Sequence, residues 1–246
     1  PCIPCCPPYA EWAKSGEPTI LISPPLEPNP LMLFLNRTAH ILHDDNARVF
    51  DTVGRVWRRV PESAEGGSEI ELFDAVRWLQ RESGKPARAP VSIAGPRDAS
   101  TAELADAEAL GHGVAELGLS VLCGGLEGVM TAAAKGAHAA GGTVIGLLPD
   151  ADWRAANPYI TVSLASGVGM ARNVLIAEAG LCLVAVGGGY GTLSEMAYAK
   201  QFERPVIALQ SAPEMDGVNR LGSVEDALPA IARIALNLDG TETAWR

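Results

Sequence analysis

The chain of 246 residues contains no run of about 18 apolar residues, and we therefore expect no helix that spans a membrane. Basic residues are also scarce, since 19 lysines and arginines face 29 aspartates and glutamates and leave a net charge of −10. This excess of negative charge argues against a nucleic acid or an anionic membrane surface as the main partner. The first residues lack the basic stretch and long apolar core of a secretory signal, and we expect a cytoplasmic protein.

Two common nucleotide-binding motifs are missing. The sequence has no G-x-x-x-x-G-K-[ST] pattern, which argues against a P-loop NTPase. Residues 189–194 lack the third glycine of the dinucleotide fingerprint and follow a late strand, so an ordinary NAD enzyme fits poorly.

The five cysteines fall into two groups. Cys123 and Cys182 lie in apolar strand patterns, and we expect them to be buried thiols. The other three gather near the start of the chain: Cys2, Cys5 and Cys6. Because their spacing matches no zinc-binding pattern, we predict no metal site.

The first third of the chain differs from the rest. Residues 1–30 hold nine of the 18 prolines, which favours an extended arm over a packed element. We interpret residues 31–84 as a small α+β appendage. Leu31–Leu42 and Arg48–Arg59 are each predicted to be one strand, joined at Asp44-Asp45-Asn46 in a hairpin.

A helix is expected at the end of this appendage. Ser68 and Glu71 have the spacing of a capping box, with Ser68 as N-cap. The helix should end near Gly84, and residues 85–90 form a proline-containing linker.

From Val91 onward, short apolar strands alternate with helices, and residues 91–240 are predicted to form one α/β domain. The main strands are expected at Val91–Ala94, Leu119–Leu122, Thr143–Leu148, Leu181–Val186 and Pro205–Leu209, with a shorter one at Ile160–Leu164. This alternation predicts a doubly wound parallel sheet with helices on both faces, a three-layer arrangement. Ligands bind such sheets beyond the carboxyl ends of the strands.

Glycine-rich turns stand at two of these strand ends, residues 124–128 and 187–191. Glycines let the backbone approach a ligand, and the following helix start presents unpaired N–H groups and a partial positive charge. Each turn could therefore hold a phosphate.

Three charged side chains accompany these turns. Arg172 could clamp a phosphate or carboxylate, or form an ion pair with a surface carboxylate. Arg97, in the loop after the first strand, is a further phosphate candidate. Glu195 could accept a ribose hydroxyl, transfer a proton or cap its own helix, and spacing does not choose between these.

Gly187–Glu195 resembles the P-G-G-x-G-T-x-x-E motif of the Lonely Guy family, once labelled lysine decarboxylase-like. Arg172 lies where that family carries its catalytic arginine, and Cys123–Met130 resembles its other glycine loop. The resemblance covers about residues 91–210. It implies a Rossmann-like fold, a homodimer or homotetramer, and a small phosphorylated ligand. Lonely Guy enzymes hydrolyse nucleoside monophosphates to free base and ribose 5-phosphate, a role that would make Arg172 and Glu195 catalytic.

Three positions depart from the enzyme pattern. Gly187 replaces the proline, Asn173 replaces the lysine that usually follows the arginine, and Cys123 stands in place of a glycine. These changes are more similar to the molybdenum-cofactor carrier branch, whose members bind a phosphorylated pterin without turning it over. Two functions therefore stay open: a binding protein for a nucleotide or pterin, with molybdenum cofactor as one ligand, and a phosphoribohydrolase that needs no cofactor.

The same loops give the residues expected to contact the ligand: Gly95, Arg97, Gly124, Gly125, Gly128, Met170, Arg172, Asn173, Gly188, Gly189, Tyr190, Gly191, Thr192 and Glu195.

Overall fold

A computed structural model describes residues 32–60 and 66–239, and its larger part is a seven-stranded sheet. All paired strands in this sheet are parallel, and their order is β12-β11-β10-β6-β7-β8-β9. Their bounds are β6 Val91–Ala94, β7 Val121–Cys123, β8 Val144–Leu148, β9 Val162–Ala165, β10 Leu183–Val186, β11 Val206–Leu209 and β12 Asn219–Arg220. The predicted doubly wound α/β fold is confirmed.

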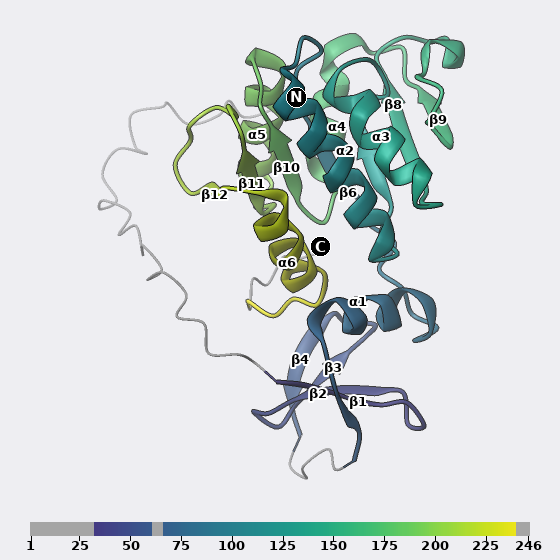
Figure 1. Ribbon diagram of the computed structural model, residues 1–246, viewed down its shortest axis with the longest axis vertical. Helices are drawn as coiled ribbons and strands as arrows, with labels where there is room; N and C mark the ends of the chain where they lie inside the picture. Colours follow the sequence, from purple (N-terminus) through teal and green to yellow (C-terminus); the bar gives the residue numbers. More distant parts are fainter. Residues whose placement is uncertain (1–31, 61–65, 240–246) are drawn as a thin grey trace, which may run out of the picture. The chain divides into compact units, whose positions relative to one another are not determined.

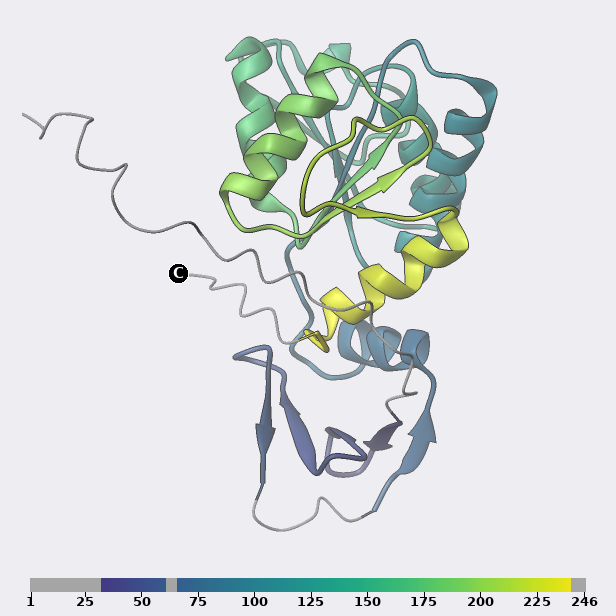
Figure 2. The same ribbon diagram turned by 90° about the vertical axis from the view of Figure 1, so that its left-hand side faces the viewer.

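Helices cover both faces of this sheet (Figures 1 and 2). One face carries α2 (Thr101–Glu116) and α3 (Val129–Ala139), which pack against each other, and α6 (Val224–Ala235) contacts α2. The other face carries α4 (Asn173–Ala179) and α5 (Tyr190–Gln201), another packed pair. Every residue of β6, β7, β10 and β11 is buried, as expected for strands covered on both sides.

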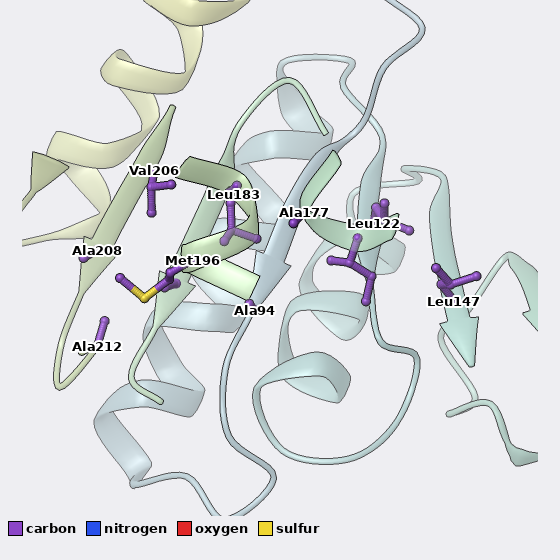
Figure 3. Packing of buried hydrophobic residues seen from close by; sticks show 12 residues of the cluster. Ala94, Leu122, Leu147, Ala177, Leu183, Met196, Val206, Ala208 and Ala212 are labelled. Carbon is purple, nitrogen blue, oxygen red and sulfur yellow. The ribbon is translucent and has the colours of Figure 1, made fainter. Parts of the chain in front are cut away.

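The core beneath α4 and α5 shows which of their side chains pack against the sheet. Met196 of α5 and Ala177 of α4 lie over Leu183 and Ala94 of the sheet, with Val206 beside them (Figure 3). Met196 is fully buried, and burying such a side chain stabilises the fold by about 1.5–3 kcal/mol. The core therefore fixes the two helices whose first turns face the carboxyl edge of the sheet.

The start of α2 shows how a helix can be set by local sequence. The Ser100 side chain accepts a hydrogen bond from the Glu103 amide, and the Glu103 carboxylate accepts one from the Ser100 amide. This capping box satisfies two N–H groups that would otherwise lack partners.

Residues 33–60 and 66–70 form a separate five-stranded antiparallel sheet of order β4-β3-β2-β1-β5. Its strands are β1 Leu33–Asn36, β2 Ile41–Asp44, β3 Arg48–Asp51, β4 Val56–Arg59 and β5 Ser68–Ile70. The turn at residues 44–46 joins β2 and β3 as predicted. The expectation of one strand on each side of it was wrong, because each predicted strand folds back on itself.

Polar side chains and unusual backbone angles make these two extra turns. The Asn36 side chain accepts a hydrogen bond from the Ala39 amide, and His40 has a φ of 54°. Similarly, the Asp51 carboxylate accepts from the amide of Gly54, and Arg55 also has a φ of 54°. Asn and Asp commonly nucleate turns in this way.

The predicted capping box at Ser68 was also wrong. Ser68 lies in β5 and pairs with Leu35 of β1, so strand pairing outweighs the local capping pattern. Helix α1 runs from Leu72 to Arg81 with Glu71 as N-cap, and no side-chain hydrogen bond caps it.

Other boundaries differ from prediction by one to three residues. The 3-10 helix η3 (Gly169–Arg172) directly precedes α4. A further 3-10 helix, η2, spans Trp153–Ala155. No helix in the described ranges is long and apolar enough to cross a membrane. The predicted proline-rich arm, with its three cysteines, lies outside the described residues.

Candidate functional site

The chain changes direction in the large sheet between β6 and β10. From β6 it moves outward through β7, β8 and β9, and it then returns to β10 on the other side of β6. At such a switch point the loops that leave neighbouring strands diverge and open a crevice. A cavity of about 340 Å³ lies here, which we call the central cavity.

Ten of the predicted residues line the central cavity: Gly95, Arg97, Gly124, Met170, Arg172, Asn173, Gly189, Gly191, Thr192 and Glu195. Four others, Gly125, Gly128, Gly188 and Tyr190, are not among its lining residues. The lining also includes residues that the sequence did not single out: Ile93, Ala94, Pro96 and Met130. Their positions at the end of β6 and the start of α3 are the only sequence signal that could have identified them.

Arg172 is the buried cation of this cavity. Its side chain is 5% exposed, and its Nη1 atom lies 3.8 Å from Oε1 of Glu195. Within the described residues, its Nε and Nη1 atoms have no hydrogen-bond partner. Burial lowers the pKa of Arg172, Glu195 opposes this, and nearby Arg97 adds to the lowering. An arginine nevertheless stays charged in proteins, so its free donors can bind an acceptor on a ligand.

Gly124 makes room for this guanidinium. A Cβ at Gly124 would lie 2.4 Å from both Nη1 and Nη2 of Arg172, far inside van der Waals contact. The glycine after β7 therefore acts here by leaving space for a side chain.

Glu195 lies on the first turns of α5 and faces Arg172. Burial raises the pKa of Glu195 to about 7, and the positive charge of Arg172 partly offsets this rise. The carboxyl group can therefore change its protonation state near neutral pH. Cys123, by contrast, is an inert thiol, since burial raises its pKa to about 11.

Asn173 joins the start of α4 to the start of α5. Its Nδ2 atom donates to Oγ of Ser194 at 3.0 Å and lies 3.5 Å from the Gly191 carbonyl oxygen. These contacts fix the orientation of the amide. The Oδ1 atom is buried without a partner in the described structure, and Asn173 lines the cavity. The position thus offers a neutral hydrogen-bond acceptor to a ligand.

The glycine loop after β10 is shaped by its backbone. Gly187 has a φ of 64° and Gly188 a φ of 153°, both unfavourable for residues with side chains. Gly189 is the N-cap of α5, and no side chain caps the helix. The first amides of α5, which has 12 residues, therefore remain available to an anion, and Thr192 adds a buried hydroxyl.

The buried carboxylate of Glu103 packs against the glycine loop that follows β10. Glu103 Oε1 accepts a hydrogen bond from Ser211 Oγ at 2.6 Å. The same atom would lie only 2.0 Å from a Cβ at Gly187. The hydrogen bond to Ser211 is the largest of the effects that lower the pKa of Glu103, so a fixed negative charge packs against Gly187.

One backbone amide at the end of the second glycine loop is already used within the protein. The Val129 amide at the start of α3 donates to the Pro96 carbonyl oxygen at 3.1 Å, so it is already occupied. This loop holds the segment after β6 in place. No group of three or more metal-binding side chains occurs in the part of the chain that the structure describes.

Comparisons with known proteins point to one group. The model of the SLOG cluster4 family matches residues 88–230. An uncharacterized protein of Archaeoglobus fulgidus is 38% identical over 119 residues, which are 48% of this chain and 78% of that protein.

Two solved structures resemble the same region. The molybdenum cofactor binding protein of Rippkaea orientalis is 29% identical with a TM-score of 0.56, over 60% of this chain and 98% of that chain. The molybdenum cofactor carrier protein of Chlamydomonas reinhardtii is 32% identical, also with a TM-score of 0.56, over 60% of this chain and 98% of that one.

Proposed function

The chain belongs to the SLOG cluster4 family, and from that premise we propose that its central cavity binds a phosphorylated nucleotide or pterin-type ligand and releases it chemically unchanged. The observation that carries this proposal is buried Arg172, whose Nε and Nη1 donors have no partner in the described structure. A buried donor without a partner costs about 1–3 kcal/mol, which a ligand acceptor would recover.

The charges and dipoles around the cavity favour an anion. Arg97 and Arg172 both line it, and the uncapped start of α5 presents free amides. Only Glu195 is acidic among the lining residues, and its raised pKa leaves it partly protonated at neutral pH. A phosphate at Gly189, Gly191 and Thr192 therefore fits the site.

Molybdenum cofactor is the pterin that the solved relatives suggest, because both are described as proteins that bind or carry it. The donor set suits such a ligand. The amides of the glycine loop would hold its phosphate, Arg172 would donate to an acceptor, and Oδ1 of Asn173 would accept from a donor. A bound pterin would supply the metal-binding group itself, and the protein would orient and shelter it.

Asn173 favours binding over hydrolysis. It stands where Lonely Guy enzymes usually carry lysine, and its Nδ2 atom is engaged with Ser194. The position next to Arg172 in the chain thus holds a neutral amide in place of a cation that could stabilise a leaving group. A carrier needs only to hold its ligand, and a neutral amide is sufficient for that.

A second function rests on Glu195. A buried carboxyl with a pKa of about 7 beside an arginine is a common arrangement for proton transfer in catalysis. In a phosphoribohydrolase, Glu195 and Arg172 would act together on the N-glycosidic bond of a nucleoside monophosphate. The expected homo-oligomer and the cytoplasmic location are further parts of the proposal, which the family resemblance and composition support.

Calorimetric titration with molybdenum cofactor and with guanosine monophosphate tests the proposal. Arg172→Met keeps most of the buried volume and removes the donors, so it should weaken binding by about 10- to 100-fold. Arg172→Lys keeps the charge without the planar fork and should recover part of the loss. Undiminished binding by Arg172→Met, with both variants folded by circular dichroism, would contradict the assignment.

A further inference from the structure

A second cavity of about 440 Å³ lies at the same edge of the sheet, and we call it the side cavity. Its lining comes from the segments that follow β7 and β8: Leu126, Glu127, Thr131, Asp150, Ala155, Asn157 and Pro158, with Arg97 from the segment after β6. Arg97 also lines the central cavity, so the two cavities meet at this residue.

The backbone around Arg97 is held in place by the second glycine loop. Gly128 has a φ of 69°, and a Cβ there would lie 2.4 Å from the Pro96 carbonyl oxygen and 2.5 Å from Cα of Arg97. The two loops are thus in direct contact. The Arg97 side chain is exposed, and no other described residue holds it through a hydrogen bond or ion pair. The backbone of Arg97 is therefore fixed, whereas its charged guanidinium group is not held by another described residue and borders both cavities.

The walls of the side cavity are already ordered. The Leu126 carbonyl oxygen accepts hydrogen bonds from Thr131 Oγ1 at 2.7 Å and from Asn157 Nδ2 at 3.0 Å. The backbone N–H of Asn157 donates to the Gly125 carbonyl oxygen at 2.9 Å. These bonds join the loop after β7 to the segment after β8 and keep the cavity open.

The two cavities differ in charge. The central cavity has two arginines and one carboxyl group of raised pKa, whereas the side cavity has Glu127 and Asp150 against Arg97 alone. In the described structure neither carboxylate makes a side-chain hydrogen bond or ion pair, so both can accept from a ligand. Two carboxylates repel a second free phosphate and favour N–H and O–H groups.

The sheet sets the distance between the cavities. The central cavity lies at β10 and β6, and the side cavity at β7 and β8, the next two strands in order. Two strand spacings amount to about 10 Å, a span that a sugar and its phosphate linkage can bridge.

We propose that the side cavity is a subsite for an uncharged, hydrogen-bond-donating group, such as a second nucleoside, joined through the phosphate that the central cavity binds. Arg97 contacts the linking phosphate, and Glu127 and Asp150 accept hydrogen bonds from the group beyond it. This inference rests on the proposed function, since it extends the ligand of the central cavity.

The test compares three probes by calorimetric titration: guanosine monophosphate, guanosine diphosphate, and two guanosines joined through a diphosphate. The unaltered chain should bind the two-nucleoside probe about tenfold more tightly than the monophosphate, the gain expected from one or two added hydrogen bonds. Ala155→Phe, at an exposed residue, fills the side cavity and should abolish this gain while the affinity for monophosphate stays the same. Ala139→Phe is the matched control, because Ala139 is exposed on α3 and lines neither cavity.

A second variant tests the charges. Glu127→Gln combined with Asp150→Asn should raise the affinity for guanosine diphosphate and lower the gain of the two-nucleoside probe. Equal affinity for the monophosphate and the two-nucleoside probe, or a gain that survives Ala155→Phe, would overturn the subsite while leaving the central cavity intact. If none of the three probes binds, the proposed function fails and the subsite fails with it.

Discussion

Replacing Glu195 by glutamine should stabilise the folded protein, and the gain should grow with pH. The ordinary glutamate pKa of 4.5 rises to about 7 in the fold because burial disfavours the charged form more than Arg172 favours it. At pH values between 4.5 and about 7, Glu195 has lost its proton in the unfolded chain but keeps it in the folded chain. The contribution of Glu195 to stability is therefore most favourable below pH 4.5 and falls as pH rises toward 7.

The size of this effect follows from the two pKa values. Ionising Glu195 in the fold costs about 3 kcal/mol more than ionising it in the unfolded chain, at about 1.4 kcal/mol per pH unit. The side chain is 10% exposed, so solvent screens it little. Glutamine mimics the protonated carboxyl group at every pH. The stability difference between Glu195→Gln and the unaltered chain should therefore increase by about 2 kcal/mol from pH 5.5 to pH 8.5.

Urea denaturation at several pH values measures this difference, with the m-value as a check that the same transition is compared. Glu116→Gln serves as control, because Glu116 is exposed at the end of α2. A difference that does not change with pH, or a Glu195→Gln variant less stable than the unaltered chain at pH 8.5, would refute the reasoning. The latter result would mean that the Arg172 charge depends on ionised Glu195.

Two glycines give further predictions. Gly124→Ala should weaken binding of guanosine monophosphate about as much as loss of Arg172, since its Cβ would displace the guanidinium. Gly222→Ala is the control, because Gly222 is exposed outside the central cavity and its Cβ would come no nearer than 3.9 Å to Asp226; equal binding by both variants would count against the role of Arg172. Gly187→Pro, which restores the proline of the Lonely Guy motif, should destabilise the fold by about 3 kcal/mol or more, because φ is 64°, its amide donates to the Leu209 carbonyl oxygen and Glu103 fills the space. Thermal unfolding measures the second effect, and a melting temperature within a degree or so of the parent would contradict it.

Most of the fold could be predicted from local patterns. Apolar strands that alternate with helices predict a doubly wound sheet, and the structure has one. The resemblance to Lonely Guy and molybdenum cofactor carrier proteins, predicted from Gly187–Glu195 and Arg172, is confirmed by the family match and by the solved relatives.

The errors arose where distant residues or rare backbone angles decide the outcome. Ser68 has a local helix-capping pattern, but pairing with Leu35 draws it into a strand. His40 and Arg55 adopt positive φ values, which are uncommon for residues other than glycine. The residue types at these positions therefore do not indicate a turn.

In the candidate site, too, local patterns predicted some features, whereas contacts between distant residues decided others. The motif was enough to select Arg172 as a site residue, but it did not decide between a ligand contact and an ion pair with a surface carboxylate. In the structure Arg172 is buried beside Glu195. The sequence identified Asn173 only as a missing lysine, whereas the free Oδ1 acceptor depends on the Ser194 contact across two helices. The contact between Glu103 and Gly187 joins residues 84 positions apart in the sequence, and no local pattern indicated it.

The central claim is that the cavity holds its ligand without breaking it. The most direct measurement incubates the protein with guanosine monophosphate and with adenosine monophosphate, separates bound from free ligand, and analyses both fractions by chromatography. Intact nucleotide in the bound fraction, and its loss from that fraction in Arg172→Met, is the predicted result. Free base that accumulates with time, and that disappears in Glu195→Gln, would contradict the claim and identify a phosphoribohydrolase.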